Sequence, residues 1–119
     1  MKKVIVQDTD DDLLETMKII LEEADYIVLP ILRYKDVISK IKSFNPSVVL
    51  LDFRLTGEDS ISLCRKIKKE FPDISIIAMS CNTNIHKEYV RGGFDDFIAK
   101  PFDIDHLIKI LDKYTNVIL

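Results

Sequence analysis

Short apolar runs alternate with longer amphipathic stretches along this chain, and this alternation constrains its fold more than any other feature. Most of the runs are rich in Val and Ile and lack polar residues at alternate positions: Lys3–Val6, Tyr26–Leu29, Val48–Leu51, Ile74–Met79 and Phe97–Ala99. Uninterrupted apolar runs of this length are typical of strands that are covered on both faces. They therefore predict five buried parallel strands.

The stretches between these runs have the apolar spacing of helices. Four of them carry a clear stripe: Leu13, Met17, Ile20, Leu21 and Ala24; Tyr34, Val37, Ile38, Ile41 and Phe44; Leu63, Cys64, Ile67 and Phe71; and Ile104, Leu107, Ile108, Leu111 and Tyr114. A further stripe, around Ile85–Val90, is short and weak. Strands that alternate with helices predict an α/β domain in which helices cover both faces of a parallel sheet.

Length and charge limit the possible functions. A chain of 119 residues suits a single domain. Seventeen basic against 20 acidic residues give a formal net charge of −3, which argues against direct binding to nucleic acid. The chain has no apolar run long enough to span a membrane, and Asp8 follows the first residues too closely for a signal peptide. We therefore expect a cytoplasmic protein without membrane contact.

The two cysteines, Cys64 and Cys81, do not form a CxxC pair. So few sulfur and imidazole ligands argue against a zinc site. We expect both thiols to be buried or half-buried, because free cysteine most often packs in a core.

Polar residues follow four of the predicted strands. Gln7 and Asp8 follow the first strand, the third ends at Asp52, Ser80 follows the fourth and Lys100 the fifth. The carboxyl ends of parallel strands share one edge of the sheet, so these side chains are expected to converge there. Two carboxylates suit Mg²⁺, and a carboxylate can also attack phosphorus. A lysine would offset the charge of a transferring phosphoryl group, and a serine could donate a hydrogen bond to it.

Five segments carry a resemblance to a known family: Val4–Asp8, Val48–Asp52, Gly57 with Asp59, Met79-Ser80 and Gly93–Phe102. In this order they resemble the receiver domain, the phosphoacceptor module of response regulators in two-component signalling. The resemblance covers essentially the whole chain. It implies a single receiver domain over residues 1–119 without an output domain, either a stand-alone protein or an excised piece. The implied sheet is doubly wound and flavodoxin-like, with strand order 2-1-3-4-5.

The resemblance also implies roles for individual residues. Asp52 would accept a phosphoryl group from a histidine kinase or a histidine phosphotransfer protein. Mg²⁺ would be held by Asp8, Asp52 and the main-chain carbonyl of Arg54. Lys100 would bind the phosphoryl group, and the Lys100-Pro101 bond would be cis. Ser80 and Phe97 would form the switch pair.

The implied output is a change of shape rather than catalysis. The surface formed by the fourth helix, the fifth strand and the last helix would change on phosphorylation. An unidentified downstream protein, or a second copy of the chain in a homodimer, would recognise that surface. The resemblance therefore implies a signalling switch and not an enzyme.

The chain departs from the family pattern at several positions. Gln7 stands where the family usually has an acidic residue, so it could hold only a metal-bound water and Mg²⁺ affinity is expected to be low. Thr56 and Ser60 replace a usual Pro and Gly, and the segment from Ser80 to Lys100 is slightly short.

Three other interpretations remain possible from the sequence. Gln7 favours a degenerate receiver that binds partners without being phosphorylated. Asp8 and Asp10 resemble the nucleophile and acid of a small Mg²⁺-dependent phosphatase. The run from Asp8 to Asp12 resembles the start of a calcium loop, but Leu13 and Ile19 replace the Gly and Glu that such a loop needs.

Overall fold

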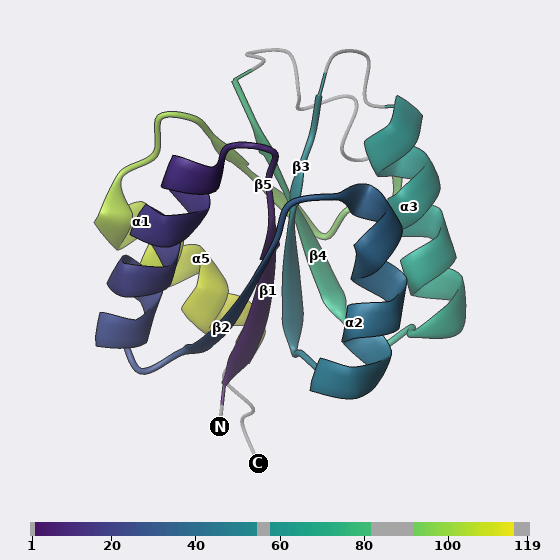
Figure 1. Ribbon diagram of the computed structural model, residues 1–119, viewed down its shortest axis with the longest axis horizontal. Coiled ribbons are helices and arrows are strands. Elements are labelled where there is room, and N and C mark those ends of the chain that lie inside the picture. The colour runs from purple at the N-terminus through teal and green to yellow at the C-terminus, as the bar shows by residue number, and fades with distance from the viewer. Residues whose placement is uncertain (1, 55–57, 82–91, 116–119) are drawn as a thin grey trace.

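The computed structural model describes residues 2–54, 58–81 and 92–115 (Figure 1). The strands are β1 (Lys3–Gln7), β2 (Ile27–Ile31), β3 (Val48–Asp52), β4 (Ser75–Ser80) and β5 (Asp96–Ala99). The helices are α1 (Asp11–Glu23), a short 3₁₀ helix η1 (Tyr34–Asp36), α2 (Val37–Phe44), α3 (Glu58–Glu70) and α5 (Ile104–Thr115). The weak helical stripe around Ile85–Val90 lies outside the described residues.

The five strands form one parallel sheet in the order β2-β1-β3-β4-β5, which confirms the predicted topology. Pro30 lies opposite Val6 in β2, at the edge of the sheet. Proline has no N–H for a ladder hydrogen bond, and an edge strand tolerates this because one of its sides has no neighbouring strand.

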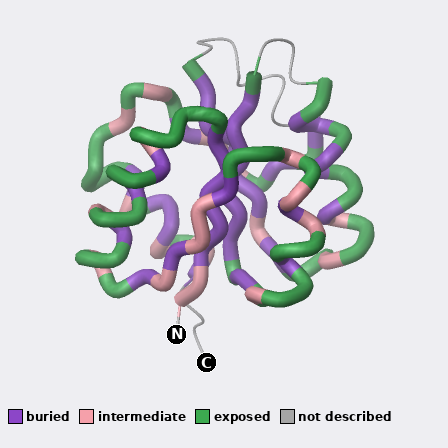
Figure 2. Tube along the Cα trace, in the orientation of Figure 1, coloured by how far each residue is buried: buried purple, intermediate pink, exposed green. Residues whose placement is uncertain are grey.

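Helices cover both faces of the sheet and create two separate apolar cores. One core joins α1 and α5 to Val4, Val6, Val48, Leu50, Ile77, Met79 and Ile98. The other joins α2 and α3 to Ile5, Val49, Leu51, Ile76 and Ala78. Neighbouring strand residues thus alternate between the two cores, as the strand period requires. Figure 2 shows the buried chain concentrated in the sheet and on the inner sides of the helices.

Two strands extend further toward their carboxyl ends than predicted. The last residues of β1, β3 and β4 are Gln7, Asp52 and Ser80; this end was predicted for β3, whereas Gln7 and Ser80 were expected to follow their strands. They pair in the sheet with Leu51, Met79 and Ala99. The reason is that the main-chain ladder does not depend on side-chain polarity. These polar side chains are therefore fixed by strand geometry instead of loop geometry.

The expectation for the cysteines is correct for one residue and wrong for the other. Cys64 is buried within α3, whereas Cys81 is exposed. Cys81 comes directly after Ser80, the last residue of β4 to pair in the sheet. Its side chain lies beyond the covered part of the strand, so the core cannot enclose it. Burial raises the pKa of the Cys64 thiol to about 12.

No helix among the described residues is both long and apolar enough to cross a membrane.

The packing of β3 predicts where this fold is least tolerant of change. Leu50 is completely buried in the core against α1 and α5, whereas Leu32 is 45% exposed. Leu50→Ala is expected to lower the free energy of unfolding by about 2–5 kcal/mol, because it removes buried methyl groups and leaves a cavity. Leu32→Ala, the matched control, should change it by less than about 0.5 kcal/mol. Urea denaturation of both variants measures the difference, and equal losses would contradict the assigned core.

Candidate functional site

A cavity of about 520 Å³ opens at the carboxyl edge of the sheet. Four of the residues that border it were predicted to meet there, namely Asp8, Asp52, Ser80 and Lys100. The remaining lining residues are Thr9, Phe53, Arg54 and Cys81. The structure therefore brings the four predicted side chains, from four separate segments, to one place.

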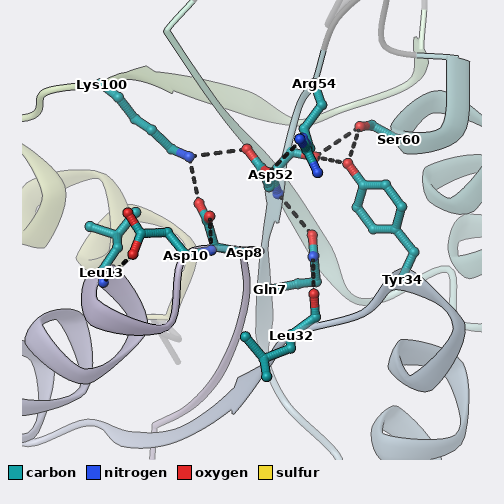
Figure 3. Close-up of polar contacts among 10 residues, drawn as sticks. All are labelled: Gln7, Asp8, Asp10, Leu13, Leu32, Tyr34, Asp52, Arg54, Ser60 and Lys100. Atoms are coloured by element: carbon teal, nitrogen blue, oxygen red, sulfur yellow. Dashed lines mark hydrogen bonds and ion pairs between the residues drawn. The ribbon is translucent and has the colours of Figure 1, made fainter.

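Lys100 connects the two carboxylates (Figure 3). Its Nζ lies 2.5 Å from Asp8 Oδ2 and 3.0 Å from Asp52 Oδ1. Its own N–H donates to the carbonyl of Ser80 at 2.8 Å, which fixes the lysine to the end of β4. The Lys100-Pro101 bond is cis, as the resemblance implied. Lys100 follows β5, which β4 separates from β3, so its ammonium reaches the two acids past the end of β4.

The site is buried and strongly charged. Asp8 is 2% exposed and Asp52 is 5% exposed. Burial raises the pKa of the Asp52 carboxyl, and this effect outweighs the opposing contribution of Lys100. Burial also disfavours the charged form of Lys100, but its hydrogen bonds to Asp8 and Asp52 outweigh that cost and raise its pKa. The charged form of Lys100 is therefore stabilised in the site, whereas burial disfavours the ionised form of Asp52.

The acidic run after β1 forms the start of a helix. Asp10 is the N-cap of α1, and its carboxylate accepts a hydrogen bond from the Leu13 N–H at 3.1 Å. Asp8 Oδ1 accepts the Asp10 N–H at 2.9 Å. Asp11 and Asp12 are exposed in the first helical turn. This is not the arrangement of a calcium loop, and the Asp10 carboxylate is already used to cap the helix.

Gln7 is completely buried, and both ends of its amide contact the main chain. Nε2 donates to the carbonyl of Leu32 at 3.1 Å, and Oε1 accepts the N–H of Asp52 at 3.3 Å. The side chain thus connects the end of β2 to the end of β3. The amide oxygen has a second lone pair, which could accept a hydrogen bond from a metal-bound water.

Sequence analysis missed two residues of this site. Tyr34 was assigned to an apolar helical stripe, yet it lies in η1 and its hydroxyl donates to the Asp52 carbonyl. Ser60, read only as a departure from a usual glycine, is 1% exposed and donates to the same carbonyl at 2.8 Å. A tyrosine in an apolar stripe gives no signal of where its hydroxyl points. The serine in a glycine position was the one available sign.

The two predicted switch residues lie on adjacent strands. Ser80 is buried at the end of β4 and borders the cavity. Phe97 is half-buried on β5, opposite Ala78, and packs against the core on the α3 side. It also borders a second hollow of about 680 Å³ between β5 and α5.

The donors at the cavity fit Mg²⁺. Asp8 and Asp52 share the Lys100 ammonium, and Asp52 Oδ2 also lies 3.8 Å from Arg54 Nε, so the carboxylate oxygens already face positive charge. The described residues contain no group of three or more acidic, histidine or cysteine side chains that could hold a metal. Two carboxylates with a main-chain oxygen and waters are the kind of set that Mg²⁺ accepts.

Comparisons with known proteins agree with this geometry. The family model of the response regulator receiver domain matches residues 4–112. The DNA-binding transcriptional regulators NtrC of Proteus hauseri and Escherichia coli are 32% and 31% identical over 81 residues, which is 66% of this chain. The chain matches only 17% of the length of these relatives.

Solved structures show the same fold. A response regulator from Thermotoga maritima has a TM-score of 0.86 with 26% identity, over 97% of this chain and 98% of that one. The response regulator TrrA from the same organism, in complex with Mg²⁺ and BeF, has a TM-score of 0.85 with 24% identity, over 96% and 99% of the two chains. Because the family model matches most of its length, this chain belongs to the response regulator receiver domain family.

Proposed function

We propose that this domain is a phosphorylation-dependent signalling switch in which Asp52 accepts a phosphoryl group from a histidine kinase or a histidine phosphotransfer protein. One observation carries the proposal: the Lys100 ammonium is hydrogen-bonded to both Asp8 and Asp52 at the border of an open cavity. Family membership supports it, since receiver domains are signalling modules of two-component systems. The proposal places the protein in the cytoplasm.

In the proposed reaction, a carboxylate oxygen of Asp52 forms a bond to phosphorus. The bond between phosphorus and the donor's imidazole nitrogen breaks, and its electron pair stays on that nitrogen. Lys100 offsets the charge of the phosphoryl oxygens as they arrive. Mg²⁺, held by Asp8, Asp52 and the main-chain oxygen of Arg54, would supply further positive charge at the same place.

The switch would begin with the negative charge that a phosphoryl group adds to Asp52. A phosphoryl group carries nearly two negative charges and new acceptor oxygens. Ser80 and Lys100 can donate to these oxygens, at roughly 1.5–3 kcal/mol for each charged hydrogen bond. Converting a mostly inactive population to a mostly active one takes about 5.5 kcal/mol, so these two contacts nearly suffice.

The output surface in this proposal includes β5 and α5. Movement of Ser80 toward the phosphoryl group would let Phe97 change its position. Phe97 borders the hollow between β5 and α5, together with Phe102, His106 and Lys109. A downstream protein, or a second copy of the chain, would recognise the altered surface. The fourth helix expected at this face falls within residues 82–91, outside the described residues. We propose no nucleic-acid or membrane contact for this domain.

A second candidate function is supported by Gln7. Its amide contacts the main chain at both ends, so it adds no negative charge for a metal. A receiver with weak Mg²⁺ binding could act as a protein-binding module that is never phosphorylated. The experiment below separates this function from the switch and from a phosphatase that uses Asp8.

Treatment with Mg²⁺ and acetyl phosphate should add one phosphoryl group to the protein, as measured by intact mass spectrometry. Asp52→Asn should abolish the adduct because it removes the nucleophile, whereas Asp73→Asn, at an exposed position, should not. A protein that gives neither an adduct nor turnover would be the binding module. Steady release of phosphate that is lost in Asp8→Asn would identify the phosphatase.

Asp52→Asn should also raise the free energy of unfolding at neutral pH. Because burial raises the pKa of Asp52 in the folded state, its ionised form destabilises the fold above that pKa. As the pH falls through the folded and then the unfolded pKa, the wild-type carboxyl takes up its proton. The advantage of the variant should therefore shrink in acid. Urea midpoints as a function of pH test this, with Asp73→Asn as a control expected to show no such trend. A variant less stable than the wild type at pH 7 would contradict the electrostatic assignment.

Gln7→Glu should tighten Mg²⁺ binding by on the order of tenfold, because it adds a nearby charge without changing the length of the side chain. The new oxygen would face the Leu32 carbonyl in place of the amide N–H, so the metal-free variant should be less stable. Added Mg²⁺ should restore part of that stability. Isothermal titration calorimetry measures the affinity. Unchanged or weaker binding would count against a metal site beside Gln7.

A further inference from the structure

The main chain of Asp52 lies one residue beyond the point where β1 stops pairing with β3. The last pair between these strands is Gln7 with Leu51. The next residue of β1's segment, Asp8, donates its N–H to the Ile31 carbonyl on β2 instead. On the other side of β3, Phe53 still donates to Met79 at 2.7 Å. The N–H and carbonyl of Asp52 therefore need partners other than the ladder, because unpaired buried main-chain groups are costly.

Three side chains supply these partners. Gln7 accepts the N–H, and the hydroxyls of Tyr34 and Ser60 both lie against the carbonyl oxygen (Figure 3). The two hydroxyl oxygens are themselves 2.7 Å apart. They have only two hydrogens for three contacts, so either both donate to the carbonyl or one donates through the other. In each arrangement at least one O–H points at the carbonyl of Asp52.

The two hydroxyls come from separate segments of the chain. Tyr34 belongs to η1, which precedes α2, and Ser60 lies in the first turn of α3. Ser60 is almost fully buried, and burial raises the pKa of Tyr34, so its hydroxyl remains a neutral donor at physiological pH. A glycine at position 60, which the family resemblance led us to expect, would supply no donor.

We infer that Tyr34 and Ser60 are positioning residues for phosphoryl transfer: their hydroxyls form a clamp on the Asp52 carbonyl that holds its carboxylate toward Asp8 and Lys100. This inference rests on the proposed function, since it assigns the clamp to the reaction of Asp52. Positioning matters because a small displacement of a reacting group slows a reaction strongly. The clamp residues do not touch the phosphoryl group, and act only through the main chain of Asp52.

The test uses Tyr34→Phe, Ser60→Ala and the double variant. Each single variant keeps one hydroxyl on the carbonyl, so its phosphorylation rate should fall only about two- to threefold, whereas the double variant should fall by on the order of tenfold. The maximal rate with acetyl phosphate and Mg²⁺ should fall, and the donor concentration that gives half of it should not change. Tyr26→Phe is the matched control, because its hydroxyl bonds Asp112 and Thr115 near the start of β2, at the opposite edge of the sheet. It should reduce stability without slowing phosphorylation.

A second measurement does not depend on phosphorylation. The carbonyl ¹³C resonance of Asp52 should move upfield in the double variant, because the carbonyl loses its hydrogen-bond donors. A wild-type maximal rate in the double variant, corrected for its folded fraction, would overturn the positioning role, and so would an unmoved carbonyl resonance.

Failure of the proposed function gives a different pattern. If wild-type Asp52 is never modified, the switch proposal fails. A carbonyl resonance that still moves in the double variant would then make the clamp a purely structural feature, which also overturns its assignment to phosphoryl transfer.

Discussion

The Lys100 ammonium between two buried carboxylates is the interaction on which the site depends. Asp8 and Asp52 are nearly inaccessible, and two like charges so close together would repel strongly without a cation. Lys100 bonds both of them and is anchored to β4 through its main-chain N–H. A buried acid pair of this kind is costly to maintain, which is why it is informative about function. A fold that needed only stability would place apolar residues at these positions.

The sheet explains why these groups meet. Parallel strands end at the same edge, and the strand order places β1 and β3 side by side with β4 next to them. Asp52 closes β3 while Asp8 begins the connection to α1, so the two acids arrive from adjacent strands. The apolar cores on the two faces of the sheet fix the positions of the strands that end at this edge. Strand pairing and packing thus set the position of Asp52 and Ser80, whereas Asp8 and Lys100 come from the residues directly after β1 and β5.

The sequence was sufficient for the parallel α/β class and for the four converging polar residues, because both follow from periodicity and from the common edge of parallel strands. The strand order came only from the family resemblance. The sequence was not sufficient for strand ends, since the ladder continues through polar residues such as Gln7 and Ser80. It also failed for Cys81, whose exposure depends on where β4 ends. The clamp was beyond its reach, because the direction of the Tyr34 hydroxyl depends on the short 3₁₀ helix η1, which the apolar spacing did not reveal.

Different groups contact the main chain of Asp52 and its carboxylate. Its main chain is bonded by neutral groups, namely an amide and two hydroxyls, whereas its carboxylate contacts charged groups. A change of charge on the carboxylate directly alters its charge-assisted hydrogen bond with Lys100 and its repulsion from Asp8. The neutral bonds to the main chain do not depend on that charge. In the proposed switch, Asp52 would therefore gain a phosphoryl group while its backbone stays fixed. The response would then pass to the groups proposed to bind the new oxygens, Ser80 and Lys100, and would not be lost in movement of the strand itself.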